Sequence, residues 1–347
     1  LLRTKYRFNG YIHVKAIPGA PDELLSRAGY LADRVSINLE LPTAQSLSKL
    51  APNKSFKTIL EPMEKITGTI AANRLALGKE ARMERSSINR YLTGSIFNQN
   101  GTDNGQAALS GTQRTALESG DKLSLPAVSK DMCVKRPFAP AGQSTQMIIG
   151  ATPETDLTLI RTTQHLYKNY DLKRVFYSAY IPLNEDSALP QLDADVPLLR
   201  EHRLYQADWL LRFYGFQADE LLSESRPNFN EQLDPKCDWA IRHLGQFPVE
   251  VQNASYDMLL RIPGIGPKSA RRIVETRRYA KLDFDILKKI GVVLKRAHYF
   301  ITCNGRMMYR IPIEESYITE CLTDDNHKEN WEITHQNEKY QQLSLFE

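Results

Sequence analysis

The segment Pro263-Gly264-Ile265-Gly266-Pro267 restricts the fold more than any other part of the sequence, because neither a helix nor a strand continues through it. Upstream, Ser255 is a typical helix N-cap residue, and Asp257 falls in the first turn of the helix that it would open. Downstream, Pro267 suits the first turn of a second helix. The sequence predicts two short helices joined by a tight hairpin and held together by apolar side chains: Ile262, Ile265, Ala270, Ile273 and Val274.

The backbone of this hairpin is expected to face outward. Gly266 lets another molecule approach the chain closely, and the amides of residues 264–266 and 268–269 would lie at a helix N-terminus, which favours anions. The segment resembles the helix-hairpin-helix motif of DNA repair proteins, which implies contact with the phosphate backbone. A plain tight turn is the alternative, but it would require neither both glycines nor the flanking charge. The residues expected to contact DNA are Pro263, Gly264, Ile265, Gly266, Lys268, Ser269, Arg271 and Arg272.

A second, degenerate hairpin is predicted to follow, with residues 283–291 leading into a helix over 292–300. Paired hairpins would hold the DNA backbone without reading the base sequence. Lys268 suggests another chemistry, because bifunctional DNA glycosylases with this hairpin use a lysine at the equivalent position as the Schiff-base nucleophile. Such an enzyme also needs an aspartate nearby. The only near candidates, Asp283 and Asp285, fall in the second hairpin, so a phosphate contact is the favoured role for Lys268.

The charge of the chain is concentrated around the hairpins. The net charge of the 347 residues is only +4, yet residues 259–310 contain 13 Lys/Arg and 3 Asp/Glu. Residues 311–347 contain 2 Lys and 9 Asp/Glu. A short basic stretch of this kind is typical of a surface that binds a polyanion. The alternative is a solvated basic face without a partner, which the hairpin sequence makes less favourable.

The sequence indicates neither a membrane protein nor a protein with a cysteine-bound metal site. The sequence has no apolar run near the ~20 residues that span a bilayer and does not begin with a signal segment, so a cytoplasmic protein without a membrane partner is predicted. The cysteines, Cys133, Cys237, Cys303 and Cys321, are too far apart for a zinc ribbon or an iron–sulfur loop. Free thiols are therefore expected, and no metal ligand is assigned to this chain.

Residues 1–78 and 132–197 alternate between strand-like and helix-like patterns. The expected strands are 11–17, 34–40, 145–150 and 173–181, and the expected helices are 21–32, 55–75, 154–170 and 198–214. Repeated strand–helix units imply a parallel sheet or an α/β barrel. Several polar residues fall at the carboxyl ends of these strands, where such folds bind ligands.

The remaining regions are predicted from composition. Residues 79–131 read as a flexible polar insertion, 198–252 as a helical linker region and 311–347 as an acidic disordered tail. The five residues before the last, Gln342, Leu343, Ser344, Leu345 and Phe346, resemble the pentapeptide by which bacterial repair and replication proteins dock on the sliding clamp. Leucine and phenylalanine anchors on a flexible tether fit an apolar groove. Chance is the alternative for so short a match.

Three segments, residues 8–20, 141–154 and 177–182, resemble radical S-adenosylmethionine (SAM) proteins, and residues 148–154 are similar to the strand and loop that cradle the adenine. The particular family is that of DNA modification and repair radical SAM proteins, often encoded beside a uracil-DNA-glycosylase-like protein. Residues 199–216 and the hairpin belong to the same resemblance, which covers about 1–78 and 132–310. It implies an α/β fold in which a partial radical SAM-type (β/α) barrel precedes an all-α helix-hairpin-helix domain at 253–310. It also implies SAM binding by Asn38, Glu40, Ile149, Gly150, Glu154, Tyr177 and Ser178.

One feature of that family is missing from the sequence. Its members bind a [4Fe–4S] cluster through a CxxxCxxC loop, and this chain has no such loop. Because the sequence starts at Leu1 and a strand follows soon after, the loop is expected upstream, and this chain alone is expected to be inactive toward SAM. The leading hypothesis is the C-terminal part of a radical SAM enzyme of DNA modification or repair. The alternative is a non-catalytic DNA-binding adaptor that recruits a glycosylase or the sliding clamp.

Overall fold

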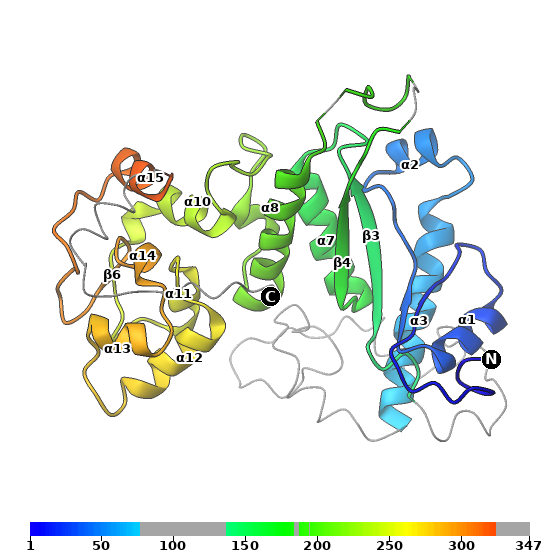
Figure 1. Ribbon diagram of the computed structural model, residues 1–347, viewed down its shortest axis with the longest axis horizontal. Coiled ribbons are helices and arrows are strands. Elements are labelled where there is room, and N and C mark those ends of the chain that lie inside the picture. The colour runs from blue at the N-terminus through cyan, green and yellow to red at the C-terminus, as the bar shows by residue number, and fades with distance from the viewer. Residues whose placement is uncertain (77–136, 184–186, 194, 324–347) are drawn as a thin grey trace, which may run out of the picture. The chain divides into compact units, whose positions relative to one another are not determined.

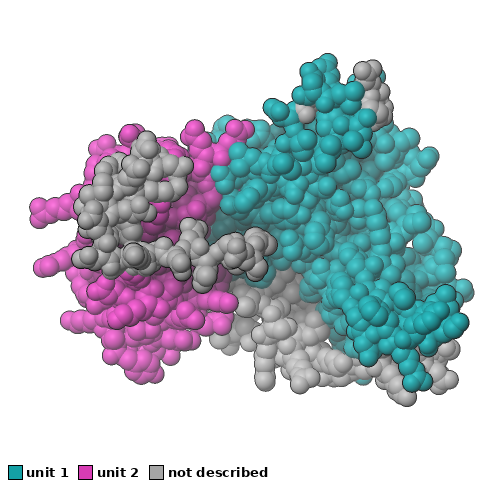
Figure 2. Space-filling model, viewed as in Figure 1, with its two compact units in different colours: residues 1–229 teal, residues 230–347 magenta. Residues whose placement is uncertain are grey.

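The computed structural model describes residues 1–76, 137–183, 187–193 and 195–323 (Figure 1). The chain divides into two compact units, residues 1–229 and residues 230–347 (Figure 2). The boundary falls inside the region predicted as a helical linker, so the two units share the residues of that region. The polar insertion at 79–131, Cys133 and the clamp-like residues 342–346 lie outside the described residues.

Unit 1 is built on a four-stranded parallel sheet whose strands follow one another in chain order. The strands are β1 (His13–Lys15), β2 (Arg34–Ser36), β3 (Gln143–Ile149) and β4 (Arg174–Ala179). An isolated bridge from Glu40 to Met147 extends the pairing of the second and third strands. All four strands lie where they are predicted; the first, second and fourth are shorter than expected, and the third begins two residues earlier. Each crossover returns to the next strand along, which is the order found in a strand–helix barrel.

The helices of unit 1 are α1 (Asp22–Leu31), α2 (Ala44–Leu50), α3 (Phe56–Ala76), α7 (Asp156–Tyr170), α8 (Leu198–Trp209) and α9 (Ala218–Leu221). Their apolar residues pack against one face of the sheet, where Gln143 of β3 bonds to Met63 of α3 at 2.9 Å and Tyr177 of β4 bonds to Thr163 of α7 at 2.7 Å. Contacts link α1 to α3, α3 to α7, and α7 to α8 in turn. Figure 1 shows α7 and α8 beside β4.

Side chains of helix α8 cover the outer edge of β4. The Tyr205 hydroxyl accepts from the Tyr177 amide at 3.0 Å and donates to the Tyr177 carbonyl at 2.8 Å, while Glu201 accepts from the Ala179 amide at 2.6 Å. These bonds use the backbone groups with which a further strand would pair. Among the described residues the four strands form an open sheet, and the partial radical SAM-type barrel that the resemblance implies is not shown. The helix predicted over 198–214 ends in one π-helical turn, η2 (Leu210–Tyr214).

Unit 2 is mainly helical. Its helices are α10 (Pro235–Arg242), the short 3₁₀ turn η3 (Leu244–Gln246), α11 (Tyr256–Arg261), α12 (Pro267–Thr276), α13 (Phe284–Lys289), α14 (Leu294–Ala297) and α15 (Glu315–Thr323). Two short strands, β5 (Val249–Glu250) and β6 (Ile301–Thr302), pair in parallel on either side of the hairpin region. The resemblance implied an all-α domain, but this unit also contains a short parallel pair of strands. The Glu250 carboxylate fastens this pair by accepting from Thr302 at 3.0 Å and from the Gly305 amide at 2.8 Å.

Part of the predicted disordered tail is folded. Helix α15 contacts α10, and its residues Ile318 and Cys321, three positions apart, are buried on one side of the helix. Disorder was predicted from the acidic composition of this region, which gives no information about the buried apolar side of the helix. Among the residues that the structure describes, no helix has the length and apolar character needed to cross a membrane.

Candidate nucleic-acid interface

The first hairpin has the geometry that its sequence predicts. Ser255 caps α11 by accepting from the Met258 amide at 3.1 Å. Gly264 takes a positive φ of 79°, and Gly266 is the N-cap of α12, with Pro267 at its first position. The chain thus turns back within a few residues, and α11 and α12 are in contact.

Gly264 is required by the close approach of the second hairpin. A Cβ at this position would lie 2.4 Å from the Val293 carbonyl oxygen, which is closer than atoms can pack. The Gly264 carbonyl accepts from the Val293 amide at 2.9 Å. Both the positive φ and the contact exclude other residues, because a side chain would be strained and would also clash.

A second hairpin is present where the sequence predicts it. Asp283 caps α13 by accepting from the Ile286 amide at 2.7 Å, Gly291 takes a φ of 92°, and α14 follows. The expected helix over 292–300 is shorter, since α14 has only four residues. The Asp283 carboxylate, one of the two aspartates considered for a glycosylase, therefore serves as the N-cap of α13.

The two hairpins differ in which backbone amides are available. In the second, the amides of Gly291, Val292 and Val293 all donate to carbonyls of the protein. In the first, the amides of Gly264, Gly266, Lys268 and Ser269 donate to no acceptor among the described residues. These four donors lie at the N-terminal end of the ten-residue helix α12, whose dipole favours an anion. The first hairpin is therefore the one equipped to bind a phosphate.

The side chains predicted to contact DNA separate into two groups. Lys268, Arg271 and Arg272 are exposed, and Arg272 donates to the Ile290 carbonyl at 3.1 Å. Pro263 and Ile265 are buried in the core between the helices. These two residues shape the hairpin, and contact through their side chains is excluded by burial. Ser269 is also buried, and its hydroxyl donates to the Gly291 carbonyl at 2.7 Å.

Lys236 of α10 supports the hairpin, and nothing in the sequence indicated this role. Its Nζ donates to the Ile265 carbonyl at 2.6 Å, and only 8% of the residue is exposed. Burial lowers the pKa of Lys236 to about 7. Nearby, Asp234 caps α10 and pairs with Arg296 of α14 at 3.1 Å. The sequence carries no local signal for this contact, because the two partners are 29 residues apart.

The residues implied to bind SAM lie on unit 1, toward the carboxyl ends of its strands. Asn38 donates to Gln146 at 3.3 Å, and Glu40, at a φ of 67°, accepts from Lys54 at 3.0 Å. Burial raises the pKa of Glu154, but hydrogen bonds from Ser46, Thr152 and Thr43 outweigh that effect and hold the pKa below its ordinary value. Gly150 follows β3 with a φ of 87°.

Two members of that set point elsewhere. Tyr177 and Ile149 are buried, and the Tyr177 hydroxyl bonds to Thr163 in the helix layer. Their side chains lie on the face of the sheet opposite to Ser178 and therefore cannot contact a ligand on the Ser178 side. Ser178 itself is half-buried on the other face.

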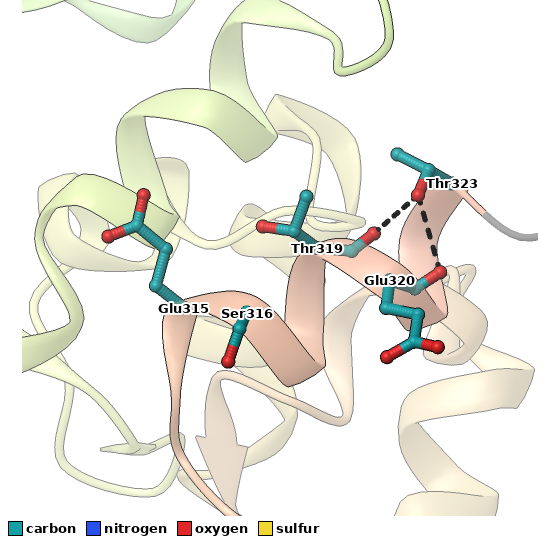
Figure 3. A pocket seen from close by; sticks show the side chains of 5 residues that line it. All are labelled: Glu315, Ser316, Thr319, Glu320 and Thr323. Atoms are coloured by element: carbon teal, nitrogen blue, oxygen red, sulfur yellow. Dashed lines mark hydrogen bonds between the residues drawn. The ribbon is translucent and has the colours of Figure 1, made fainter.

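A hollow on the surface of α15 offers no site for DNA (Figure 3). It is lined by Glu315, Ser316, Thr319, Glu320 and Thr323, and its two carboxylates would repel a phosphate. The Thr323 hydroxyl is already bonded to the Thr319 carbonyl at 2.8 Å.

Comparison with known protein families agrees with the geometry of unit 2. Residues 249–276 match the helix-hairpin-helix motif family. The match spans β5, α11, the first hairpin and α12, and it supports binding to nucleic acid. Comparisons with curated proteins and with solved structures gave no match to this chain.

Proposed function

We propose that this chain binds duplex DNA by its phosphate backbone, without reading the base sequence, through the first hairpin of unit 2. The observation that carries the proposal is the set of four unbonded amides at residues 264, 266, 268 and 269, beside the exposed Lys268 and Arg271. Backbone amides donate hydrogen bonds to a phosphate and lysine neutralises its charge, but neither carries information about the bases. The second hairpin contributes by fixing the first in place.

Salt dependence tests this proposal. The affinity of a backbone-binding protein falls linearly with salt on a log–log scale, with a slope of about −0.9 for each phosphate contact on duplex DNA. Replacing Lys268 and Arg271 together by glutamine should weaken binding equally on unrelated duplexes and reduce the magnitude of the slope by about 0.9 to 1.8. Arg278→Gln is the matched control, because Arg278 is an exposed arginine just beyond the far end of α12.

Either of two results would overturn the proposal. One is an unchanged slope in the double variant. The other is a loss of affinity confined to one sequence, because that would indicate contacts with base edges.

A catalytic role for unit 1 is the second proposal, which rests on the resemblance to radical SAM enzymes of DNA modification or repair. The chain order of β1 to β4 and the polar groups at their carboxyl ends favour it. The described residues of unit 1 contain no cysteine, and no group of His, Cys, Asp or Glu in the described part of the chain could hold a metal ion. A [4Fe–4S] cluster does not fit these residues, so no radical step is derived for them.

Binding of SAM is the part of this second proposal that the chain itself can test. Calorimetry should detect binding of SAM, and Glu154→Gln should weaken it, whereas Glu61→Gln on the exposed side of α3 should not. Absence of binding would leave the non-catalytic adaptor as the better account. Anaerobic treatment with iron and sulfide, followed by an assay for 5′-deoxyadenosine, should give no product with this chain, because its described residues offer no set of cluster ligands.

Protein partners are proposed from sequence alone. The match of residues 342–346 to the clamp-docking pentapeptide suggests the bacterial sliding clamp, and the family resemblance suggests a uracil-DNA-glycosylase-like protein. Deleting residues 342–347 should abolish binding to the clamp and leave DNA binding intact. Equal clamp affinity in the deletion variant would remove this partner.

A further inference from the structure

The face of the unit 1 sheet that points away from the helices is polar and basic. Paired residues of parallel strands point to the same side of the sheet, so the register places Lys15, Ser36, Ser144 and Arg174 in one row across all four strands. His13 and Arg34 form the neighbouring row. A parallel sheet covered by helices on both faces is apolar on both, so this composition indicates a face kept for a ligand.

Three polar atoms on this face are buried without a partner. They are the Ser144 hydroxyl, the Arg34 Nε and the Arg174 Nε. Ser144 is completely buried, and its neighbours in the register are Ser36 and Arg174. An unpartnered buried hydroxyl or guanidinium N–H destabilises the fold unless something accepts from it. All three can donate, and the two guanidinium Nε–H groups can only donate, so one acceptor group would complete the set.

The charges around these donors indicate that the acceptor is an anion. Arg34 and Arg174 are fixed in orientation, the first by a bond to the Ala141 carbonyl at 3.2 Å and the second by stacking over Phe176 at 4.8 Å. Burial, and then the positive charge of Arg34, lower the pKa of His13. The Glu40 carboxylate is paired with Lys54 at 3.0 Å and lies 3.9 Å from Lys15, which is in the row of Ser144. Two arginines and a hydroxyl in neighbouring rows of one sheet face are typical of a phosphate site.

We propose that this face of the sheet binds the phosphate group of a nucleotide between Arg34, Ser144 and Arg174. Two residues further along each strand, about 7 Å from the row of Ser144 and Arg174, lies a row that could bind the base. This second row favours a nucleotide over free phosphate as the ligand. It contains Asn38, Gln146 and Phe176, and the bond from Asn38 to Gln146 leaves one amide acceptor and one amide donor for a base edge. The site is separate from the hairpin and does not rest on the DNA binding proposed for unit 2.

Calorimetry with three probes tests the ligand class. Deoxyadenosine 5′-monophosphate should bind, inorganic phosphate should bind more weakly, and deoxyadenosine should not bind measurably. Equal affinities for the nucleotide and for inorganic phosphate would overturn the assignment to a nucleotide. Binding of deoxyadenosine as tight as that of the monophosphate would overturn the phosphate site.

Ser144→Ala is the most informative variant, because binding and stability should move in opposite directions. Removal of an unpartnered hydroxyl should leave the melting temperature unchanged or higher, while the affinity for the nucleotide should fall roughly 10- to 100-fold, the equivalent of one hydrogen bond to a charged group. A lower melting temperature with unchanged affinity would show that Ser144 is only structural and would overturn the proposal.

Arg174 variants complete the test. Arg174→Gln should abolish nucleotide binding, and Arg174→Lys should restore part of it because the charge returns. Arg27→Gln, on the exposed surface of α1, is the control and should bind normally. The Lys268→Gln and Arg271→Gln double variant should also bind the nucleotide normally, which distinguishes this site from the hairpin. Unchanged binding in Arg174→Gln would exclude the site.

Discussion

The Ser269 hydroxyl of the first hairpin donates to the Gly291 carbonyl of the second at 2.7 Å. A reciprocal bond runs from the Val293 amide to the Gly264 carbonyl at 2.9 Å. The second hairpin therefore uses its polar backbone to hold the first, and the first keeps its own amides open. This division of roles explains why the second copy is degenerate in sequence, since a supporting hairpin needs only one glycine and a matching shape.

Ser269→Ala should separate support of the hairpin from contact with DNA. The variant leaves the Gly291 carbonyl without its partner and should lower the free energy of unfolding by about 1 kcal/mol. The amide of residue 269 remains, so DNA affinity at low salt should change less than twofold. Chemical denaturation and a duplex titration measure the two effects. A large loss of affinity without a loss of stability would show that the hydroxyl itself contacts DNA.

Gly264→Val should damage the hairpin twice, through the positive φ and through the contact with Val293. The strained backbone alone costs on the order of 1–2 kcal/mol, and the clash forces the two hairpins apart. We expect a lower melting temperature and weaker binding to every duplex tested. Gly245→Ala is the control, because a Cβ there meets no atom within 4 Å. Normal DNA binding by Gly264→Val would contradict the assigned geometry.

Lys236→Met should change how stability depends on pH. Burial lowers the pKa of Lys236 from its ordinary 10.5 to about 7 in the folded protein. Between these values the unfolded chain binds more protons, so the folded state gains stability as pH rises, by up to ~1.4 kcal/mol per pH unit. The methionine variant lacks this gain. Its stability relative to the original chain should therefore be most favourable below pH 7 and decline toward pH 10.

Urea unfolding of both proteins at pH 6, 8 and 10 measures this difference, and other groups that titrate near pH 10 cancel in the comparison. Parallel stability curves would contradict the lowered pKa. The same variant loses the bond to the Ile265 carbonyl, so weaker DNA binding is expected at each pH.

The hairpin was predictable because its constraints are local. Two glycines, two prolines and a serine cap each restrict the backbone within a few residues, whatever the rest of the chain does. The roles of Ser269 and Lys236 were not predictable, because each depends on a carbonyl more than twenty residues away. The sequence predicted that Ser269 contacts phosphate. Only the packing of the second hairpin shows that its hydroxyl instead joins the two hairpins.

The sheet of unit 1 was likewise predictable strand by strand but not in its closure. Alternation such as Val35, Ser36, Ile37, Asn38 identifies a strand with one apolar and one polar face. Whether the outer edge of β4 meets another strand depends on Tyr205 and Glu201, which lie on α8 more than twenty residues downstream. The family resemblance grouped Tyr177 with Ser178 as SAM-binding residues, although the strand register puts their side chains on opposite faces of the sheet.

Ile318→Asp should test whether the region after residue 310 is part of the folded unit. Ile318 is completely buried on the side of α15 where Cys321 is also buried, and α15 contacts α10, which carries Lys236 and Asp234. A buried, unpaired carboxylate should destabilise unit 2 by about 3 kcal/mol or more. Ser316→Asp makes the same change at an exposed position in the first turn of α15, where an acidic side chain is favourable. Thermal unfolding should therefore separate the two variants. Equal melting temperatures would show that α15 contributes nothing to unit 2, and that the acidic tail begins directly after the second hairpin.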